Sequence, residues 1–99
     1  MKITGAQCRA ARALIEWPRH QVAQLSGVEA AIIADFEAGR GNPDEDVVDR
    51  LRRVLEEGGA VFISDNGGGV GVRLKFSRKD VRAINKWENE GGPIGTDDV

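Results

Sequence analysis

The side chains that most often carry out chemistry are few in this chain and are not grouped together. Its 99 residues include one cysteine, Cys8, and one histidine, His20. Cys8 has no neighbouring base in the sequence, so we expect a small residue of the core or its boundary rather than a nucleophile. Asp97 and Asp98 have no further ligand nearby, and no group of residues has the spacing of a zinc site. We therefore predict that the protein is not an enzyme and that it binds no metal or other cofactor.

A glycine-rich stretch, Asn66–Val72, invites comparison with a phosphate-binding loop. It lacks the G-x-x-x-x-G-K-[ST] pattern, and the residues that follow it read as a strand rather than as the helix that such a loop precedes. We interpret this stretch as the turn of a β-hairpin.

The overall composition leaves binding functions open. Lys and Arg number 14 against 16 Asp and Glu, a net charge of −2, whereas a strongly basic domain is the usual footprint of nucleic-acid binding. The local distribution of charge matters more than this sum. One cysteine cannot form a disulfide within the chain and suits a reducing cytoplasm. Met1–Ala6 lacks the apolar core of a signal peptide, and no apolar run approaches the roughly 20 residues of a membrane span, so we expect no membrane contact.

The first part of the chain carries the start and end signals of three consecutive helices. Thr4 and Gln7 form a T-x-x-Q capping box that predicts the start of a first helix. Pro18 interrupts the apolar pattern and should begin a short second helix that ends near Leu25. A third helix is expected over residues 29–38, and glycines follow both of these helices, as helix ends favour.

A fourth helix has a strong start signal, with Asn42 as N-cap, Pro43 in the first helical position and acidic residues in the first turn. The double glycine at residues 58–59 should end it. Between these limits the apolar residues recur at helical spacing, as Val47, Val48, Leu51, Val54 and Leu55.

Beyond the fourth helix the period changes. Residues 60–64 and 70–76 read as two strands of a hairpin, the second with Val70, Val72, Leu74 and Phe76 facing the core. Ser77 should cap a last short helix that carries Ile84 and Trp87. The fold class predicted is therefore mainly α: a four-helix domain over residues 1–58, a hairpin plus helix over residues 59–89, and a flexible tail over residues 90–99.

The second and third helices have the spacing of a helix-turn-helix. Counted from Arg19, the fifth residue is Ala23, which is small where two helices cross closely, and the ninth is Gly27, which suits a turn with positive φ. The positions that should lock the two helices together hold Val22, Val28, Ile33 and Phe36.

Residues 3–58 resemble the Cro/cI-type (phage-repressor-like, XRE) family of helix-turn-helix transcriptional regulators. The resemblance is carried by the ungapped spacing of Arg12, Trp17, Ala23, Gly27, Ile33, Phe36-Glu37 and Gly39, followed by Asn42-Pro43 and the helix over residues 47–55. It implies that Arg12 pairs with Glu37, a contact between helices that we interpret as structural. It also implies DNA contacts at Arg19, Glu29, Ala30, Ala31, Ala34 and Asp35. The loop residues Arg40 and Asn42 are further candidates for contact with phosphate or a groove, and His20, at the exposed start of the second helix, either touches phosphate or faces solvent.

The face that should read bases departs from the family pattern. Direct readout needs hydrogen-bonding side chains, such as Arg or Lys for guanine and Asn or Gln for adenine. Ala30 and Ala31 offer only apolar contact, for instance to a thymine methyl, while Glu29 and Asp35 could accept from cytosine N4 but otherwise repel phosphate. Three interpretations stay open: DNA binding of low specificity, readout of DNA shape, and contact with a protein.

The second part of the chain carries an uneven charge. Basic residues outnumber acidic ones six to two over residues 59–86, and residues 87–99 carry four acids and no Lys or Arg. A lone hairpin is marginal in water, and regulators of this family generally bind as dimers. We predict a homodimer interface formed by Phe62, Leu74, Phe76, Ile84 and Trp87, or else that these residues only extend the core of the monomer.

These observations together predict a small cytoplasmic regulator that binds double-stranded DNA as a homodimer. The alternative is a protein-interaction module, antitoxin-like or accessory, on the same helical scaffold. The sequence leaves the target site and the direction of regulation open.

Overall fold

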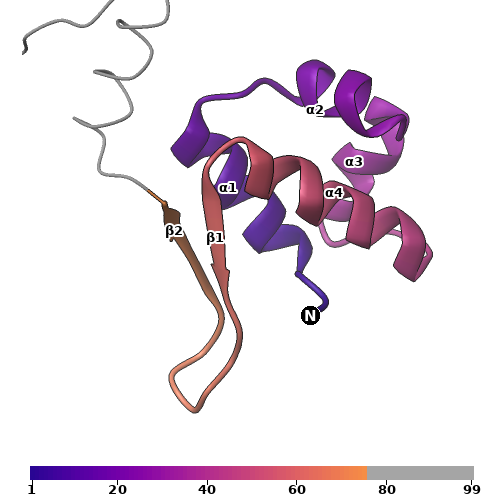
Figure 1. Cartoon of the computed structure of the whole chain (residues 1–99). Helices are drawn as coiled ribbons and strands as arrows, with labels where there is room; N and C mark the ends of the chain where they lie inside the picture. Colours follow the sequence, from indigo (N-terminus) through magenta and orange to yellow (C-terminus); the bar gives the residue numbers. More distant parts are fainter. Residues whose placement is uncertain (76–99) are drawn as a thin grey trace, which may run out of the picture.

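The computed structural model describes residues 1–75 of the 99-residue chain. Four helices are followed by an antiparallel hairpin, in the order that the sequence predicted (Figure 1). The elements are α1 (Gly5–Ile15), α2 (Arg19–Ser26), α3 (Ala30–Glu37), α4 (Glu45–Glu57), β1 (Ala60–Ile63) and β2 (Gly71–Leu74). The helix expected after Ser77 lies outside the described residues, as do Phe76, Ile84, Trp87 and the acidic tail.

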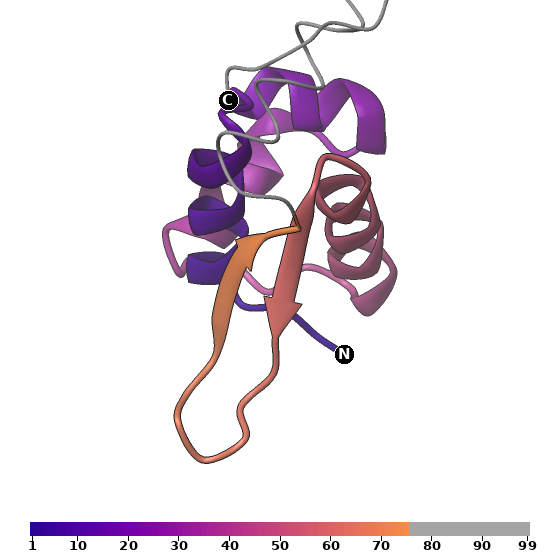
Figure 2. The ribbon, with the colours of Figure 1, turned by 60° about the vertical axis from the view of Figure 1, so that its left-hand side comes forward.

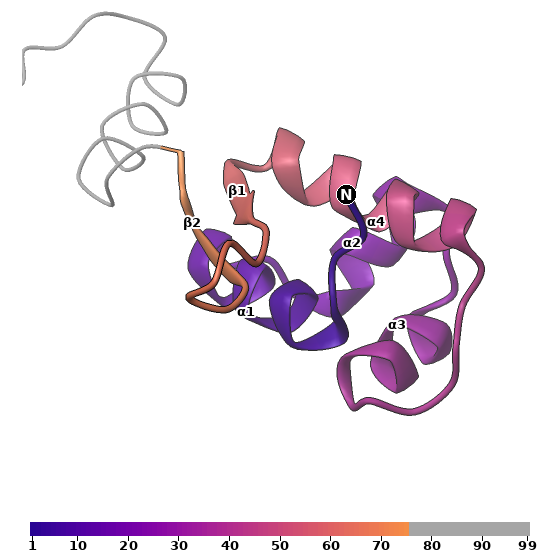
Figure 3. The same cartoon turned by 90° about the horizontal axis from the view of Figure 1, so that it is seen from below.

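Helix α1 occupies the middle of the domain. It packs against α3 and α4 on one side and against both strands on the other, while α2 packs against α3 and α4. The hairpin and α3 consequently lie at opposite ends of the domain, with α1 between them (Figure 3). Within the hairpin, β2 lies against α1 and β1 lies beside α4 (Figure 2). None of the helices within residues 1–75 has the length and apolarity needed to cross a membrane.

The start of α1 confirms the predicted capping box. The Thr4 hydroxyl accepts from the Gln7 backbone N–H at 3.0 Å, and the Gln7 side-chain oxygen accepts from the Thr4 N–H at 2.9 Å. Two backbone donors that the helix itself cannot satisfy are thereby paired. The C-cap residue, Glu16, takes the left-handed conformation with φ 61° although it is not a glycine.

Helices α2 and α3 meet at the predicted turn. Gly27 has φ 74°, and its N–H donates to the Ala23 carbonyl at 2.9 Å. Val22, Val28 and Ile33 are buried beneath the turn, and Phe36 is half-buried against the same core, so the residues expected to lock the two helices pack together. Pro18 precedes the first helical residue, Arg19, as N-cap, and the ends of α3 differ by one residue from the prediction.

The predicted start of α4 is wrong by two residues. Asp44, not Asn42, is the N-cap, and Pro43 lies in the loop rather than in the helix. Residues 39–41 fold back on the end of α3, where the Arg40 N–H donates to the Asp35 carbonyl at 2.7 Å. Asn42 and Pro43 are therefore needed to cross to α4, and the helix begins only at Glu45.

The core joins the hairpin to the helices. Its buried apolar residues are Ile3, Cys8, Ala11, Val22, Val28, Ile33, Val48, Leu51, Leu55, Ala60 and Phe62. Phe62 thus packs in the core of its own chain, while Leu74 is half-buried. Burial of Phe62 fits the other possibility that the sequence left open, an extension of the monomer core.

The hairpin is shorter than predicted. Phe62 pairs with Val72 and Ile63 with Gly71, which puts Val72 on the core side and leaves Arg73 exposed. Val70 was expected to face the core but is 48% exposed, because it lies in the connection before β2 begins. In that connection the Asp65 carboxylate accepts from the N–H groups of Gly67 and Gly69, so the glycine-rich stretch forms a turn, as expected.

Candidate nucleic-acid interface

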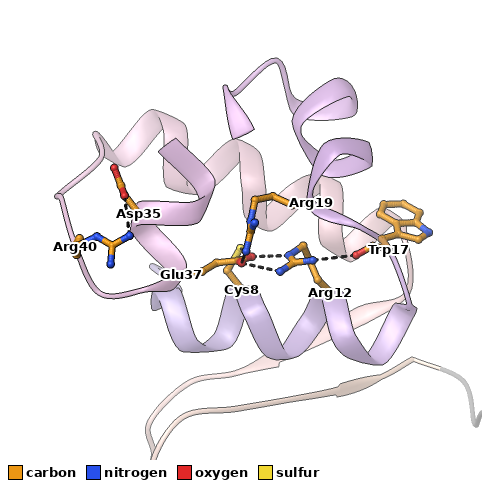
Figure 4. Close-up of polar contacts among 7 residues, drawn as sticks. All are labelled: Cys8, Arg12, Trp17, Arg19, Asp35, Glu37 and Arg40. Carbon is orange, nitrogen blue, oxygen red and sulfur yellow. Dashed lines mark hydrogen bonds and ion pairs between the residues drawn. The ribbon is translucent and has the colours of Figure 1, made fainter. Parts of the chain in front are cut away.

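The residues predicted to contact DNA lie on the start of α2, on α3 and on the loop that follows α3. All of them are exposed except Ala34, which is half-buried; the others are Arg19, His20, Glu29, Ala30, Ala31, Asp35, Arg40 and Asn42. Two cationic side chains stand at separate places along this surface. Arg19 lies at the first position of α2, whereas Arg40 lies beyond the end of α3 (Figure 4).

Side chains with hydrogen-bonding groups are scarce on the first half of α3. Glu29 is the N-cap residue, but its side chain makes no capping bond. Ala30 and Ala31 follow and are exposed, and Ile32 is 39% exposed. The helix therefore presents a smooth, apolar surface with one carboxylate at its start. Small side chains allow the backbone of such a helix to approach a partner surface closely.

Arg40 is held by the second acid of the α3 surface. Its guanidinium lies 3.2 Å from the Asp35 carboxylate, and the two side chains are 70% and 56% exposed (Figure 4). An ion pair this exposed contributes little to stability. It does compensate the charge of Asp35 locally and limits the directions in which Arg40 points. The pair borders an open groove of about 350 Å³ between α3 and α4, lined also by Ile32, Gly41, Asn42, Pro43, Asp44 and Val47.

The buried carboxylate of Glu37 connects α3 to α1 and α2. Its side chain is 2% exposed and lies 2.6 and 2.7 Å from two nitrogens of Arg12, in the bidentate pairing that the resemblance implied. The Cys8 thiol donates to one carboxylate oxygen at 3.3 Å, and Arg19 donates to the other at 3.3 Å (Figure 4). Arg12 also donates to the Trp17 carbonyl at 3.2 Å, just before α2.

The protonation states of this cluster follow from these contacts. Burial by itself would raise the pKa of Glu37, but hydrogen bonds from Arg12, Cys8 and Arg19 outweigh burial and hold that pKa below its ordinary value of 4.5. Burial, followed by the neighbouring Glu37 charge, raises the pKa of the Cys8 thiol to about 12. The cluster is therefore composed of an ionised carboxylate, a neutral thiol and two arginines.

The cysteine and the histidine of the chain lie in different environments. Cys8 is fully buried and donates to a carboxylate, which is the opposite of the activation that a nucleophilic thiol needs. His20 is exposed at the second position of α2. Over residues 1–75 no three His, Cys, Asp or Glu side chains lie close enough together to hold a metal ion.

Several contacts were missed at the level of sequence. The hydrogen bonds of Arg19 and Cys8 to Glu37 join residues of three helices, and no local sequence pattern predicts them. The close packing of Gly5 was also missed: it is the first residue of α1, directly after the N-cap Thr4. A Cβ atom at Gly5 would overlap the carbonyl group of Phe36.

Comparison of the chain with known protein families, and with curated proteins, gives no match. The interpretation of this surface therefore rests on its own geometry and charge.

Proposed function

We propose that the protein is a DNA-binding transcriptional regulator that contacts duplex DNA with the start of α2, with α3 and with the loop after α3. The observation that carries the proposal is the α2–turn–α3 unit. Its inner face is fixed by Val22, Val28 and Ile33, and its outer face is exposed along α3 between Arg19 and Arg40. Such a unit has the layout in which a second helix enters the major groove.

The charges on this surface suit the phosphate backbone. Contacts to phosphate oxygens supply most of the affinity for DNA and fix the register of a protein on the duplex. The side chains of Arg19 and Arg40 are 42% and 70% exposed and lie at two places beside α3. Each can therefore contact a DNA phosphate while α3 lies in the major groove, between the two DNA backbones. We infer low base specificity, because Ala30 and Ala31 can offer only apolar contacts such as those to thymine methyl groups.

We further propose that two copies bind together, with their α3 helices one turn of DNA apart. Because Phe62 is used in the core, the contact between copies has to use other surfaces, and the residues beyond Lys75 are the part of the chain to test. Light scattering of the protein, free and with DNA, reports the stoichiometry directly. A monomer on DNA at micromolar concentration would exclude the paired arrangement.

A protein partner is the second candidate function. It is favoured by the apolar exposure of this region, where Leu25 of α2 is 57% exposed and Ile32 of α3 is 39% exposed. Exposed apolar side chains beside alanines suit contact with another protein better than contact with phosphate.

Fluorescence anisotropy distinguishes the two functions. The protein is titrated against duplex from upstream of its own gene and against scrambled duplex, at salt concentrations between roughly 50 and 200 mM. The proposal expects binding that Arg19→Ala and Arg40→Ala each weaken, with the salt slope reduced by about one per lost contact. Arg53→Ala is the matched control, since Arg53 is 61% exposed on α4 and pairs with Asp49.

The titration distinguishes three results. Preference for the native duplex at moderate salt would indicate a site-specific regulator, and equal, salt-sensitive binding would indicate a nonspecific or shape-reading protein. Absence of binding by the native chain, together with strong binding by Ala30→Arg, would show that the native α3 surface is not a DNA surface and would favour the protein partner.

A further inference from the structure

We propose that Glu37, although buried, is a positioning residue for the phosphate contact of Arg19. The inference rests on the proposed DNA-binding function and adds a role for a residue that touches no DNA. The Glu37 carboxylate, together with Arg12, fixes both the backbone and the first side chain at the start of α2 (Figure 4).

The acceptor sites of the carboxylate set the direction of Arg19. An ionised carboxylate has about four lone-pair sites. On each oxygen of Glu37 one site takes a short bond from Arg12, at 2.6 and 2.7 Å. The second site of Oε2 takes the Cys8 thiol at 3.3 Å, and the second site of Oε1 takes Nη2 of Arg19 at 3.3 Å. With the other three sites filled, the place left for Arg19 is defined by the buried cluster.

The backbone at the start of α2 is held by the same ion pair. Nη1 of Arg12 donates to the Trp17 carbonyl at 3.2 Å, one residue before the N-cap Pro18. Pro18 makes no side-chain capping bond, so the side chain of Arg12 supplies an anchor at this helix end. Two independent links therefore run from the Arg12–Glu37 pair to the segment that presents Arg19.

The charges of Arg12, Glu37 and Arg19 allow Arg19 to bind a phosphate while it remains hydrogen-bonded to Glu37. Arg12 already neutralises the carboxylate in a bidentate pair and is 15% exposed. Arg19 adds a second positive charge, and its side chain is 42% exposed. Only one of its five N–H groups is used by Glu37, at a long distance, so the remaining donors can meet a phosphate oxygen. Such a preorganised arginine loses less side-chain freedom on binding than a free one.

The test removes the ion pair without leaving a lone buried charge. Glu37→Gln alone would strand Arg12, and such variants are strongly destabilised. The double variant Arg12→Leu/Glu37→Met keeps the net charge and replaces the pair with apolar side chains, which proteins often tolerate. Arg19→Ala is then made in the native chain and in the double variant, and the affinity for duplex DNA is measured for all four proteins. Circular dichroism checks that each is folded.

The expected result is a loss of coupling. Arg19→Ala should lower the affinity of the native chain roughly tenfold. The double variant should lower it to a similar extent, and Arg19→Ala should then have almost no further effect. Arg40→Ala is the matched control, because it should lower the affinity equally in both backgrounds. An Arg19→Ala effect that is the same in both backgrounds would overturn the inference and leave the proposed function intact.

A second measurement does not depend on DNA or on the double variant. ¹⁵N relaxation of the arginine side chains in the free native protein should show Arg19 ordered, close to Arg12, and the exposed Arg9 of α1 mobile. An Arg19 as mobile as Arg9 would overturn the inference. Absence of DNA binding by the native chain would instead remove the proposed function, and the positioning role with it.

Discussion

Gly5 in the first turn of α1 lies directly against the backbone of Phe36 near the end of α3. A Cβ atom at Gly5 would overlap the Phe36 carbonyl oxygen and would lie 2.8 Å from the carbonyl carbon and 3.2 Å from Cα of Glu37. The atoms in the way belong to the main chain, so no side-chain rotation can make room. This contact sets the distance between α1 and α3, and hence the place of Glu37 beside Arg12.

Replacement of Gly5 by alanine should therefore destabilise the fold. Overpacking costs about 3 kcal/mol when it moves a backbone. The better helix propensity of alanine is worth about 1 kcal/mol in a helix interior and less at Gly5, the first residue of α1. We expect a net loss of at least about 2 kcal/mol in the free energy of unfolding, measured by urea denaturation. Gly68→Ala is the matched control, since its nearest atom, at 3.7 Å, belongs to the side chain of Asn66. Equal effects of the two variants would contradict the close approach.

Local sequence signals predicted most of the helices and strands. The predictions that failed concern positions that tertiary contacts determine. The Thr4 capping box and the Gly27 turn depend on residues a few positions apart, and both are present as predicted. At the start of α4 the sequence predicted Asn42 as the N-cap, whereas Asp44 holds that position. The loop needed to cross from α3 sets this start, and its length does not follow from the local sequence.

At the candidate site, too, some contacts could be predicted from the sequence and others depend on tertiary packing. The spacing that resembles a known family led to Arg12 with Glu37, and the structure has that pair. The bonds of Arg19 and Cys8 to the same carboxylate depend on the packing of three helices, which local sequence does not encode. For Phe62 the sequence left a dimer interface and the monomer core open, because an apolar strand residue has the same pattern in either place. The residue is buried in the core of its own chain.

Gln7 provides a second prediction, because its side chain both caps α1 and binds the hairpin. Its oxygen accepts from the Thr4 N–H, and its nitrogen donates to the carbonyls of Ile63 at 3.3 Å and Gly71 at 2.9 Å. Gln7→Glu keeps the cap but turns a carboxylate oxygen toward two carbonyl oxygens. We expect a loss of about 2 kcal/mol in stability and faster hydrogen exchange of the hairpin amides than of the helix amides.

The control for this change is Gln24→Glu, which introduces the same charge at an exposed position of α2. It should leave both the stability and the exchange of the hairpin almost unchanged. If Gln7→Glu accelerated exchange in β1 and β2 no more than in α4, the side chain would not be what fastens the hairpin to α1.

The thiol of Cys8 should resist modification in the folded protein. It is fully buried, and burial together with the Glu37 charge raises its pKa from 9.0 to about 12. The reactive thiolate is consequently about a thousandfold rarer at pH 8 than for an ordinary thiol. We expect Ellman's reagent to label Cys8 quickly in urea and at the rate of unfolding in buffer. Cys8→Ala/Ala10→Cys moves the thiol to an exposed position of α1 and should be labelled at once; equally rapid labelling of native Cys8 would contradict its burial.

Acid should weaken the fold through Glu37. The pKa of this carboxyl is lower in the folded protein than its ordinary value of 4.5, so its contribution to stability is complete above pH 4.5 and is lost as the pH falls through the folded value. The double variant Arg12→Leu/Glu37→Met lacks this contribution, whereas Asp49 and Asp65, whose pKa values are also lowered, are common to both proteins. Urea midpoints measured from pH 7 to pH 3 should therefore fall more steeply for the native chain. Parallel curves would mean that the Glu37 carboxylate gains nothing from its three donors, and the ordered Arg19 that those contacts imply would lose its basis.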